Sequence, residues 1–269
     1  MDETRFQLIK TSGFVLSFAL VFLVQTLVPY RRAPQRGSWR QNLPLAGFNA
    51  IVLGLVCGGC LCTAARFAET RHLGLLRAAA VPRWAAIAAT VVALDFVLWG
   101  WHRANHRLPW LWRFHRVHHS DVDFDVSTGV RFHTGELVLS LPLKLATVLL
   151  LGAPLLAVLL FELVFGLFNL FVHGDIRMDP AWESRLTRVL VLPANHRQHH
   201  SQDPVQYGSN FGTVLSIWDR CLGTWAGGSS SARITTGLRD LMEAGRLSVR
   251  DCLLLPFTAG ARGPTRRTR

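Results

Sequence analysis

Four stretches of this 269-residue chain are longer and more apolar than the core of a water-soluble protein requires. Residues 13–29 contain no charge, 46–65 are uncharged throughout, and 84–101 carry one aspartate. Region 137–172 is apolar apart from one lysine, one glutamate, one asparagine and a few hydroxyls. A helix crosses the core of a bilayer with about 20 apolar residues. The sequence therefore predicts an all-α, multi-pass integral membrane bundle of about four membrane helices.

Two of these runs need interpretation. The first lacks a small-residue cleavage site close behind it and is followed by Arg31 and Arg32, so we expect a retained helix rather than a signal peptide. Region 137–172 is long enough to form two short helices, and Gly152-Ala153-Pro154 is the place where it would break.

The net charge of +12 comes almost wholly from arginine. The arginines gather at the ends of apolar runs, which favours contact with anionic lipid headgroups over nucleic acid as a partner. Positive-inside counting places loop 31–40 and, two crossings later, the histidine-rich region in the cytoplasm. The arginines of loop 66–83 conflict with this count, because that loop would lie outside. The first loop includes Arg31, Arg32, Arg36 and Arg40.

Three of the five cysteines lie within an apolar run, in the sequence CGGCLC at 57–62. One interpretation is a metal or redox motif. The favoured one is small packing residues in a membrane helix, where close approach selects Gly, Ala and Cys. The spacings imply no disulfide framework.

All histidines except His72 fall between positions 102 and 200, and eight form three boxes. The boxes read HxxxH at 102–106 and HxxHH at both 115–119 and 196–200. Positions i, i+3 and i+4 share one side of a helix, so three such helices could surround two metal ions. Imidazole suits iron, zinc and copper. We expect the first box to continue the preceding membrane helix, and Pro109 and Pro193 to open the helices of the other two.

In order and spacing, these boxes resemble those of the fatty acid hydroxylase/sterol desaturase superfamily of integral-membrane di-iron enzymes. Asp95 looks like the acidic residue that the family carries on the first box helix. RFHTGE at 131–136 resembles R-x-H-P-x-E, with Thr134 in the proline place. IWDRCLGTW at 217–225 resembles W-D-x-x-F-G-T, with Leu222 in the phenylalanine place. The resemblance covers residues 84–225.

The resemblance implies a helical membrane bundle capped by a cytosolic, helical, histidine-rich region. It implies two irons, for which zinc could substitute, and O2 as co-substrate. The reaction would be hydroxylation or desaturation of an unactivated C–H bond in a membrane lipid, whether sterol- or hopanoid-like, fatty acyl or ether lipid. A separate reductase, ferredoxin or cytochrome would supply electrons, and no catalytic residue is expected beyond the metal centre. The implied ligands are His102, His106, His115, His118, His119, His173, His196, His199 and His200.

Further residues are expected to support the ligands, because a metal-bound histidine usually donates its other N–H to a carboxylate or carbonyl. Asp95, two turns before His102, could accept such a bond or could simply be a buried polar residue of the bundle. His133 could bind metal, although support is favoured, and Asn195 could orient the last box or cap its helix. Glu136 and Asp219 complete this set. Trp99, Trp101, Trp110 and Trp112 could line the mouth of a lipid slot or form an interfacial aromatic belt, and the belt is favoured.

The chain is thus expected to comprise N-terminal membrane helices (1–83), a di-iron domain (84–225), and an interfacial helix with a disordered basic tail (226–269). The alternative is a membrane metal-binding protein without oxygenase activity, either a transporter or a lipid-binding relative. Histidines that lie in intact boxes beyond the apolar runs disfavour it, because a transport path needs polar residues inside the membrane.

Overall fold

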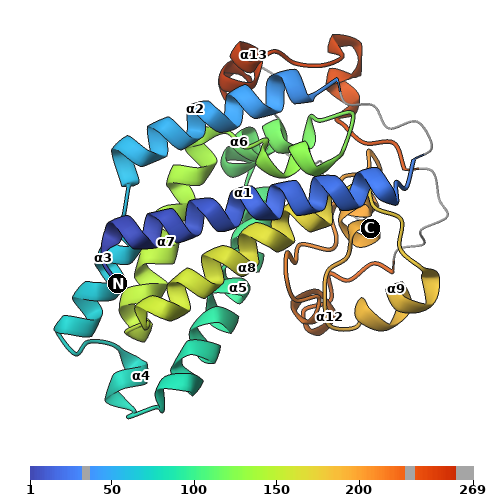
Figure 1. Cartoon of the computed structure of the whole chain (residues 1–269). Helices are drawn as coiled ribbons and strands as arrows, with labels where there is room; N and C mark the ends of the chain where they lie inside the picture. Colours follow the sequence, from blue (N-terminus) through green and yellow to red (C-terminus); the bar gives the residue numbers. More distant parts are fainter. Residues whose placement is uncertain (32–36, 228–233, 259–269) are drawn as a thin grey trace.

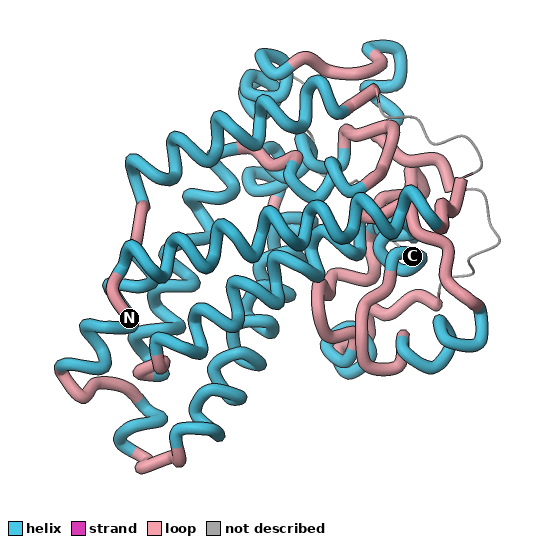
Figure 2. The backbone as a smooth tube through the Cα atoms, in the orientation of Figure 1, coloured by secondary structure: helices cyan, strands magenta, loops and turns pink. Residues whose placement is uncertain are grey.

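The computed structural model is helical, as the sequence predicts. It describes residues 1–31, 37–227 and 234–258, and among these no strand is present beyond three isolated bridge pairs (Figures 1 and 2). Arg32, Arg36 and the basic tail 262–269 lie outside the described residues. Within the described residues, five helical segments are long and apolar enough to cross a membrane: Glu3–Leu27, Trp39–Ala78, Arg83–Arg107, Thr134–Leu151 and Leu155–His173.

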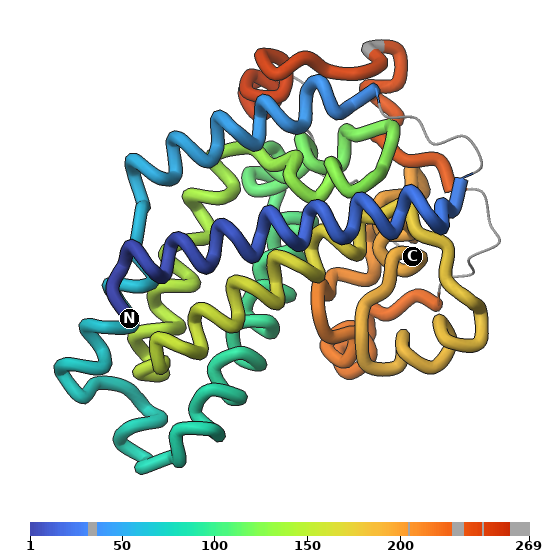
Figure 3. The backbone as a smooth tube through the Cα atoms, viewed as in Figure 1, coloured from blue at the N-terminus to red at the C-terminus, as the bar shows by residue number. Residues whose placement is uncertain are grey.

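The membrane helices form an antiparallel bundle (Figure 3). α1 (Glu3–Leu27), α5 (Arg83–Arg107) and α8 (Leu155–His173) run toward the histidine-rich cap, and α2 (Trp39–Cys57) and α7 (Thr134–Leu151) run away from it. Region 137–172 consists of two helices that break at Gly152-Ala153-Pro154. The expectation of about four membrane helices thus becomes five.

The CGGCLC run does not lie within one helix. α2 ends at Cys57, and α3 (Cys60–Thr70) begins after Gly59, whose φ of 74° belongs to the left-handed region that glycine adopts without strain. The two glycines therefore make a turn in the second apolar segment, followed by α4 (Leu75–Ala78) at the end opposite the cap (Figure 1). The five cysteines are all free.

Short helices build the cap. Pro109 and Pro193 each occupy the first turn of a box helix, as expected, because proline has no N–H to leave unpaired there. The elements are α6 (Pro109–His119), η1 (Val126–Val130), α9 (Pro180–Leu186), α10 (Pro193–His199), α11 (Pro204–Tyr207) and α12 (Ile217–Cys221).

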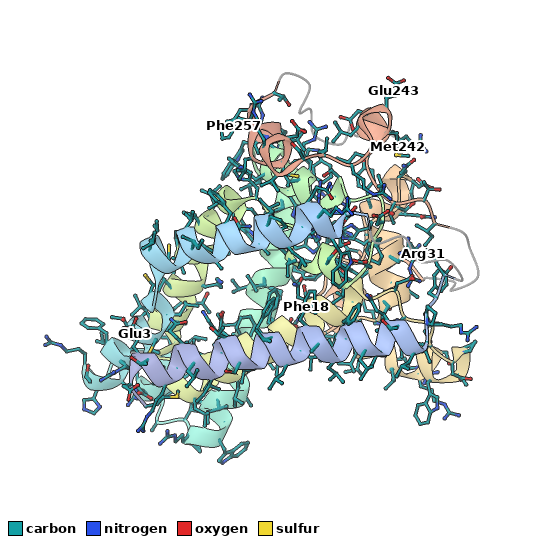
Figure 4. All side chains as sticks on the ribbon, turned by 45° about the horizontal axis from the view of Figure 1, so that its top comes forward. Glu3, Phe18, Arg31, Met242, Glu243 and Phe257 are labelled. Atoms are coloured by element: carbon teal, nitrogen blue, oxygen red, sulfur yellow. The ribbon has the colours of Figure 1, made fainter. Side chains whose placement is uncertain are left out.

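The C-terminal segment differs from the single interfacial helix expected. It forms three short elements, η2 (Arg239–Ala244), α13 (Val249–Leu254) and η3 (Leu255–Phe257). They cover α6 and the cap end of α2 through a small apolar cluster that includes Leu45 and Val117, while Phe257 is exposed (Figure 4). The Arg116–Asp240 ion pair adds to this contact. The segment is therefore packed against the cap.

The largest apolar core lies between α3, α5, α7 and α8, and includes Leu94, Val148, Val158 and Phe161. By contrast, α1 exposes large apolar side chains such as Leu16, 69% exposed, as expected of a helix in contact with lipid.

We expect Gly152→Ala to destabilise the bundle. Gly152 has a φ of 66°, and an added Cβ would lie 2.0 Å from the carbonyl oxygen of Leu73, a backbone atom that cannot rotate away. Left-handed strain alone costs about 1–3 kcal/mol, so the melting temperature of the detergent-solubilised protein should fall. Gly47→Ala is the control, because an added Cβ there meets no atom within 4 Å. Equal melting temperatures for the two variants would contradict this account.

Candidate metal centre

The structure brings all nine predicted ligand histidines into one buried cluster with two parts. Within each part the candidate ligand atoms all lie within 4.8 Å of one another. We call the parts the five-histidine group and the four-histidine group. The first comprises His102, His106, His115, His119 and His199, and the second His118, His173, His196 and His200.

Helical geometry divides the boxes between the groups. On α6, His115 and His119 are one turn apart on one face and join the five-histidine group, while His118 points to the four-histidine group. The last box has the opposite assignment, because His196 and His200 join the four-histidine group and His199 joins the other. Each HxxHH box therefore serves both groups, rather than aiming all three imidazoles at one point.

In the five-histidine group, every Nε2 atom is buried and has no hydrogen-bond partner. In the four-histidine group, the Nε2 atoms of His118, His196 and His200 lie 3.0, 3.0 and 3.3 Å from Nε2 of His173. The Nε2 atoms of each group thus face one another, and no described residue outside the cluster forms a hydrogen bond with them.

The outer nitrogens determine which ring nitrogen carries the proton. A carbonyl oxygen can only accept, so a histidine Nδ1 beside one must donate, and Nε2 then presents a lone pair. Nδ1 of His173 donates to the Asn169 carbonyl at 2.6 Å, and Nδ1 of His118 donates to the Arg131 carbonyl at 3.1 Å. Their Nε2 lone pairs therefore face each other at 3.0 Å with no proton between them.

The same arrangement holds in the five-histidine group. Nδ1 of His102 donates to the Phe211 carbonyl at 2.8 Å, and Nδ1 of His199 donates to the Ser209 carbonyl at 2.7 Å. These contacts fix the ring orientation and leave Nε2 as the metal-binding atom.

Burial keeps the imidazoles neutral. Loss of solvation, followed by repulsion from neighbouring imidazoles, lowers the pKa of His118, His119, His196 and His200 well below its ordinary value. Loss of solvation lowers the pKa of His199 to about 3. These rings are therefore unprotonated near pH 7, the form in which imidazole binds metal.

These observations fit a pair of bound cations. An unpaired buried polar atom costs about 1–3 kcal/mol, and lone pairs that face each other add repulsion, which a cation between them would remove. The groups contain imidazole alone, a donor set that suits iron, zinc or copper rather than magnesium or calcium. The cysteines belong to neither group, which favours packing as the role of the CGGCLC residues.

Glu136 lies where the sequence analysis expected a supporting carboxylate. Its Oε1 accepts a hydrogen bond from Nδ1 of His115 at 2.8 Å and another from Asn105 Nδ2 at 3.1 Å. The carboxylate holds the orientation of the His115 ring and leaves its Nε2 as the nitrogen directed at the group. Asn105, between the two histidines of the first box, was not anticipated.

Asp95 does not bond His102, contrary to the sequence-based expectation. It accepts hydrogen bonds from the indole N–H of Trp218 at 2.8 Å and from Leu215 N at 3.3 Å. Reciprocally, Asp219 accepts from the indole N–H of Trp99 at 3.0 Å. Two crossed Trp–Asp bonds therefore join α5 to α12.

Asp219 supports the site indirectly. Its carboxylate also accepts hydrogen bonds from the backbone N–H groups of Phe211 and Gly212, at 2.9 and 2.7 Å. It thereby holds the loop whose Phe211 carbonyl orients His102. Asn210 completes the loop in the left-handed region, with a φ of 55°, which asparagine tolerates better than most residues.

His133 and Asn195 act as helix caps. Nδ1 of His133 accepts from Gly135 N, and its Nε2 donates to the Leu253 carbonyl, so neither ring nitrogen is available to the cluster. Asn195 Oδ1 accepts from Leu192 N at 3.2 Å, the capping alternative considered for it. It contributes to the cluster by closing the first turn of α10.

The expectation that the tryptophans form an interfacial belt is wrong for two of them. Trp99 and Trp112 are buried, at 5% and 4% exposure. Trp112 packs on His106 and His119, with ring centroids 5.0 and 5.5 Å apart, and thus shields the five-histidine group from water. Trp110 is exposed, as a belt residue would be.

Comparisons with known proteins agree with the motif resemblance. The sequence model for fatty acid hydroxylase matches residues 87–224. The chain is 35% identical over 137 residues to the ornithine lipid hydroxylase OlsE of Rhizobium tropici, covering 50% of this chain and 40% of that protein. It is 31% identical over 136 residues to the alkylglycerol monooxygenase of Danio rerio, covering 50% and 29%.

A third relative is the cholesterol 25-hydroxylase of Rattus norvegicus, 26% identical over 161 residues, covering 58% of this chain and 51% of that protein. The chain thus spans about half or less of the length of these relatives. No solved structure gives a significant match.

Glu136→Gln is expected to weaken metal binding by about 10- to 100-fold, the usual effect of removing a carboxylate that supports a ligand. The neutral amide is a weaker acceptor for His115 Nδ1–H, so the ring becomes a poorer donor. The measurement is metal retained per chain against a graded series of chelator concentrations. Glu243→Gln, at an exposed position of η2 (Figure 4), is the matched control. Unchanged retention in Glu136→Gln would contradict the role assigned to Glu136.

Proposed function

The chain belongs to the fatty acid hydroxylase family, and from this premise we propose that it is an O2-dependent di-iron oxidoreductase that hydroxylates an unactivated C–H bond of a membrane lipid. One observation carries the proposal. Nine buried histidines form two adjoining all-imidazole groups, and every box predicted from the sequence contributes to them.

In this proposal the five-histidine group holds one iron and the four-histidine group the other. When bound, iron would supply the activation of O2, since a saturated C–H bond does not yield to acid–base chemistry. The balanced reaction converts R–H, O2, two electrons and two protons into R–OH and water. The two electrons come from a separate donor of reductase, ferredoxin or cytochrome type.

The residues of the chain prepare the site for this reaction. Carbonyl groups and Glu136 hold five of the nine imidazoles in the tautomer that presents Nε2 to a metal, which limits the reorganisation that binding would need. Trp112 and Phe211 cover the five-histidine group with apolar rings and exclude water. Water exclusion protects a reactive centre from side reactions.

The names of the relatives favour hydroxylation over desaturation. Those compared above are named as hydroxylases or a monooxygenase, and their names specify an ornithine lipid, an alkylglycerol and cholesterol. Because the three names specify different lipids, they support hydroxylation of a lipid without selecting one. We place the cap on the cytoplasmic side, where a soluble electron donor could reach it.

We expect anaerobically purified protein to contain about two irons per chain, one for each group. His118→Ala should reduce the iron content and abolish O2 uptake with a lipid extract and reductant, because it removes a ligand of the four-histidine group. Membrane insertion should persist, since His118 lies in the cap. His72→Ala, at an exposed loop position, is the control and should retain both irons.

Two results would reject the oxygenase assignment. One is wild-type protein that contains less than about one iron per chain and takes up no O2, which would favour a membrane metal-binding protein without oxygenase activity. The other is full activity in His118→Ala. Untargeted lipidomics of cells with and without the gene would then identify the product of an active enzyme.

A further inference from the structure

Arg197 is a buried cation whose hydrogen-bonding groups are not satisfied by the described residues. It lies between the first two histidines of the last box and is 4% exposed. Its Nε and Nη2 atoms are buried and have no hydrogen-bond partner. Among the described arginines, it alone has two such atoms. A buried charge without hydrogen bonds is costly, so this guanidinium calls for an explanation.

The neighbouring carboxylates do not supply the missing partner. Asp175 contacts Arg31, with Oδ1 3.1 Å from Arg31 Nε and Oδ2 3.4 Å from Arg31 N. Glu183 exerts an electrostatic effect on Arg197, but it too leaves Nε and Nη2 without a hydrogen bond. The contacts of Arg197 that the structure shows are with aromatic faces.

Those aromatic contacts place Arg197 between the membrane and the metal centre. Its Cζ lies 3.7 Å from the ring centroid of Tyr30, which follows the C-terminal end of α1 close to Arg31 (Figure 4). Cζ also lies 5.9 Å from the ring centroid of Phe124. The Phe124 ring in turn lies 4.9 Å from the ring of His200. Phe124 is therefore close to both the guanidinium and the four-histidine group.

The two unpaired atoms form one edge of the guanidinium. The N–H bonds of Nε and Nη2 point in parallel, and this edge matches the two oxygens of a carboxylate or phosphate. With its face stacked on Tyr30, the guanidinium has this edge oriented before any ligand arrives. A water molecule could accept from these N–H groups, but an oxyanion accepts from both with matching geometry and also compensates the charge.

We propose that Arg197 binds an oxyanion, a carboxylate or phosphate, in the headgroup of a lipid that enters beside the C-terminal end of α1. The position of Tyr30 at the end of a membrane helix favours a lipid as the source over a free anion. If this lipid is the substrate, which rests on the proposed function, the carbon that reacts lies near the headgroup rather than at the far end of the chain.

The test measures lipid binding without turnover. Purified iron-loaded protein in neutral detergent, without O2 or reductant, is titrated with dioleoyl phosphatidic acid and with dioleoylglycerol, which has the same chains and no phosphate. Wild-type protein should bind the phosphatidic acid at least about tenfold more tightly, the effect of one charge-assisted hydrogen bond. Arg197→Gln should lose that preference while keeping its iron content, and Arg197→Lys, which lacks the parallel edge, should be intermediate.

Arg250→Gln is the matched control, because Arg250 is an exposed arginine of the cap whose removal changes the net charge equally. It should bind both lipids as the wild type does. Equal binding of the two lipids by wild-type protein would overturn the proposal, whether or not Arg197→Gln folds. Inorganic phosphate should compete with phosphatidic acid at millimolar concentration. Binding of phosphate without binding of phosphatidic acid would overturn the lipid assignment. Because no turnover is measured, loss of the oxygenase assignment would leave this test intact.

Discussion

The cap is organised around buried histidine Nε2 atoms that face one another and receive no hydrogen bond from described residues outside the cluster. Five of the nine imidazoles have their Nδ1 protons accepted on the outside, which leaves their Nε2 lone pairs facing inward. Carbonyls of Phe211, Ser209, Arg131 and Asn169 accept four of them, and Glu136 accepts another. These acceptors belong mostly to turns and helix ends, so the irregular parts of the cap determine the metal site as much as its helices do.

Helical geometry explains why the HxxHH box occurs twice. On one helix, the residue at i+3 points to one side of residue i and the residue at i+4 to the other. One box therefore directs two imidazoles to one group and the third elsewhere. The second HxxHH box has the opposite assignment. It directs two imidazoles to the four-histidine group and one to the five-histidine group. The groups meet where the rings of His119 and His200 stack at 4.2 Å, which places the two sites side by side.

The membrane helices and box helices could be predicted because each depends on local sequence, whereas the ligand set, with His173, followed from the family resemblance. Apolar length, Pro109, Pro193 and the i, i+4 spacing of His102 and His106 act within one or two turns. The partners of Asp95 could not be predicted, because Trp218 lies far away in the sequence and the crossed Trp–Asp pair depends on tertiary packing. Backbone acceptors such as the Phe211 carbonyl leave no signal in residue identity, although the resemblance did identify Glu136 and Asp219. For the C-terminal segment, the sequence predicts one interfacial helix. Its apolar residues instead pack against the cap, and this tertiary contact is not visible in the local pattern.

The helices that position the ligand histidines are held together by hydrogen bonds that do not involve those histidines. Arg131, fully buried, donates to the Val117 carbonyl, to Asn42 of α2 and to Ser120, and so joins the second box helix to the membrane bundle. Trp99 and Asp219 do the same between α5 and α12. These bonds involve no imidazole of the cluster, so the ligand histidines are positioned by contacts that metal binding would not replace. The Arg197 guanidinium is likewise held without the ligands, because its contacts are with the rings of Tyr30 and Phe124.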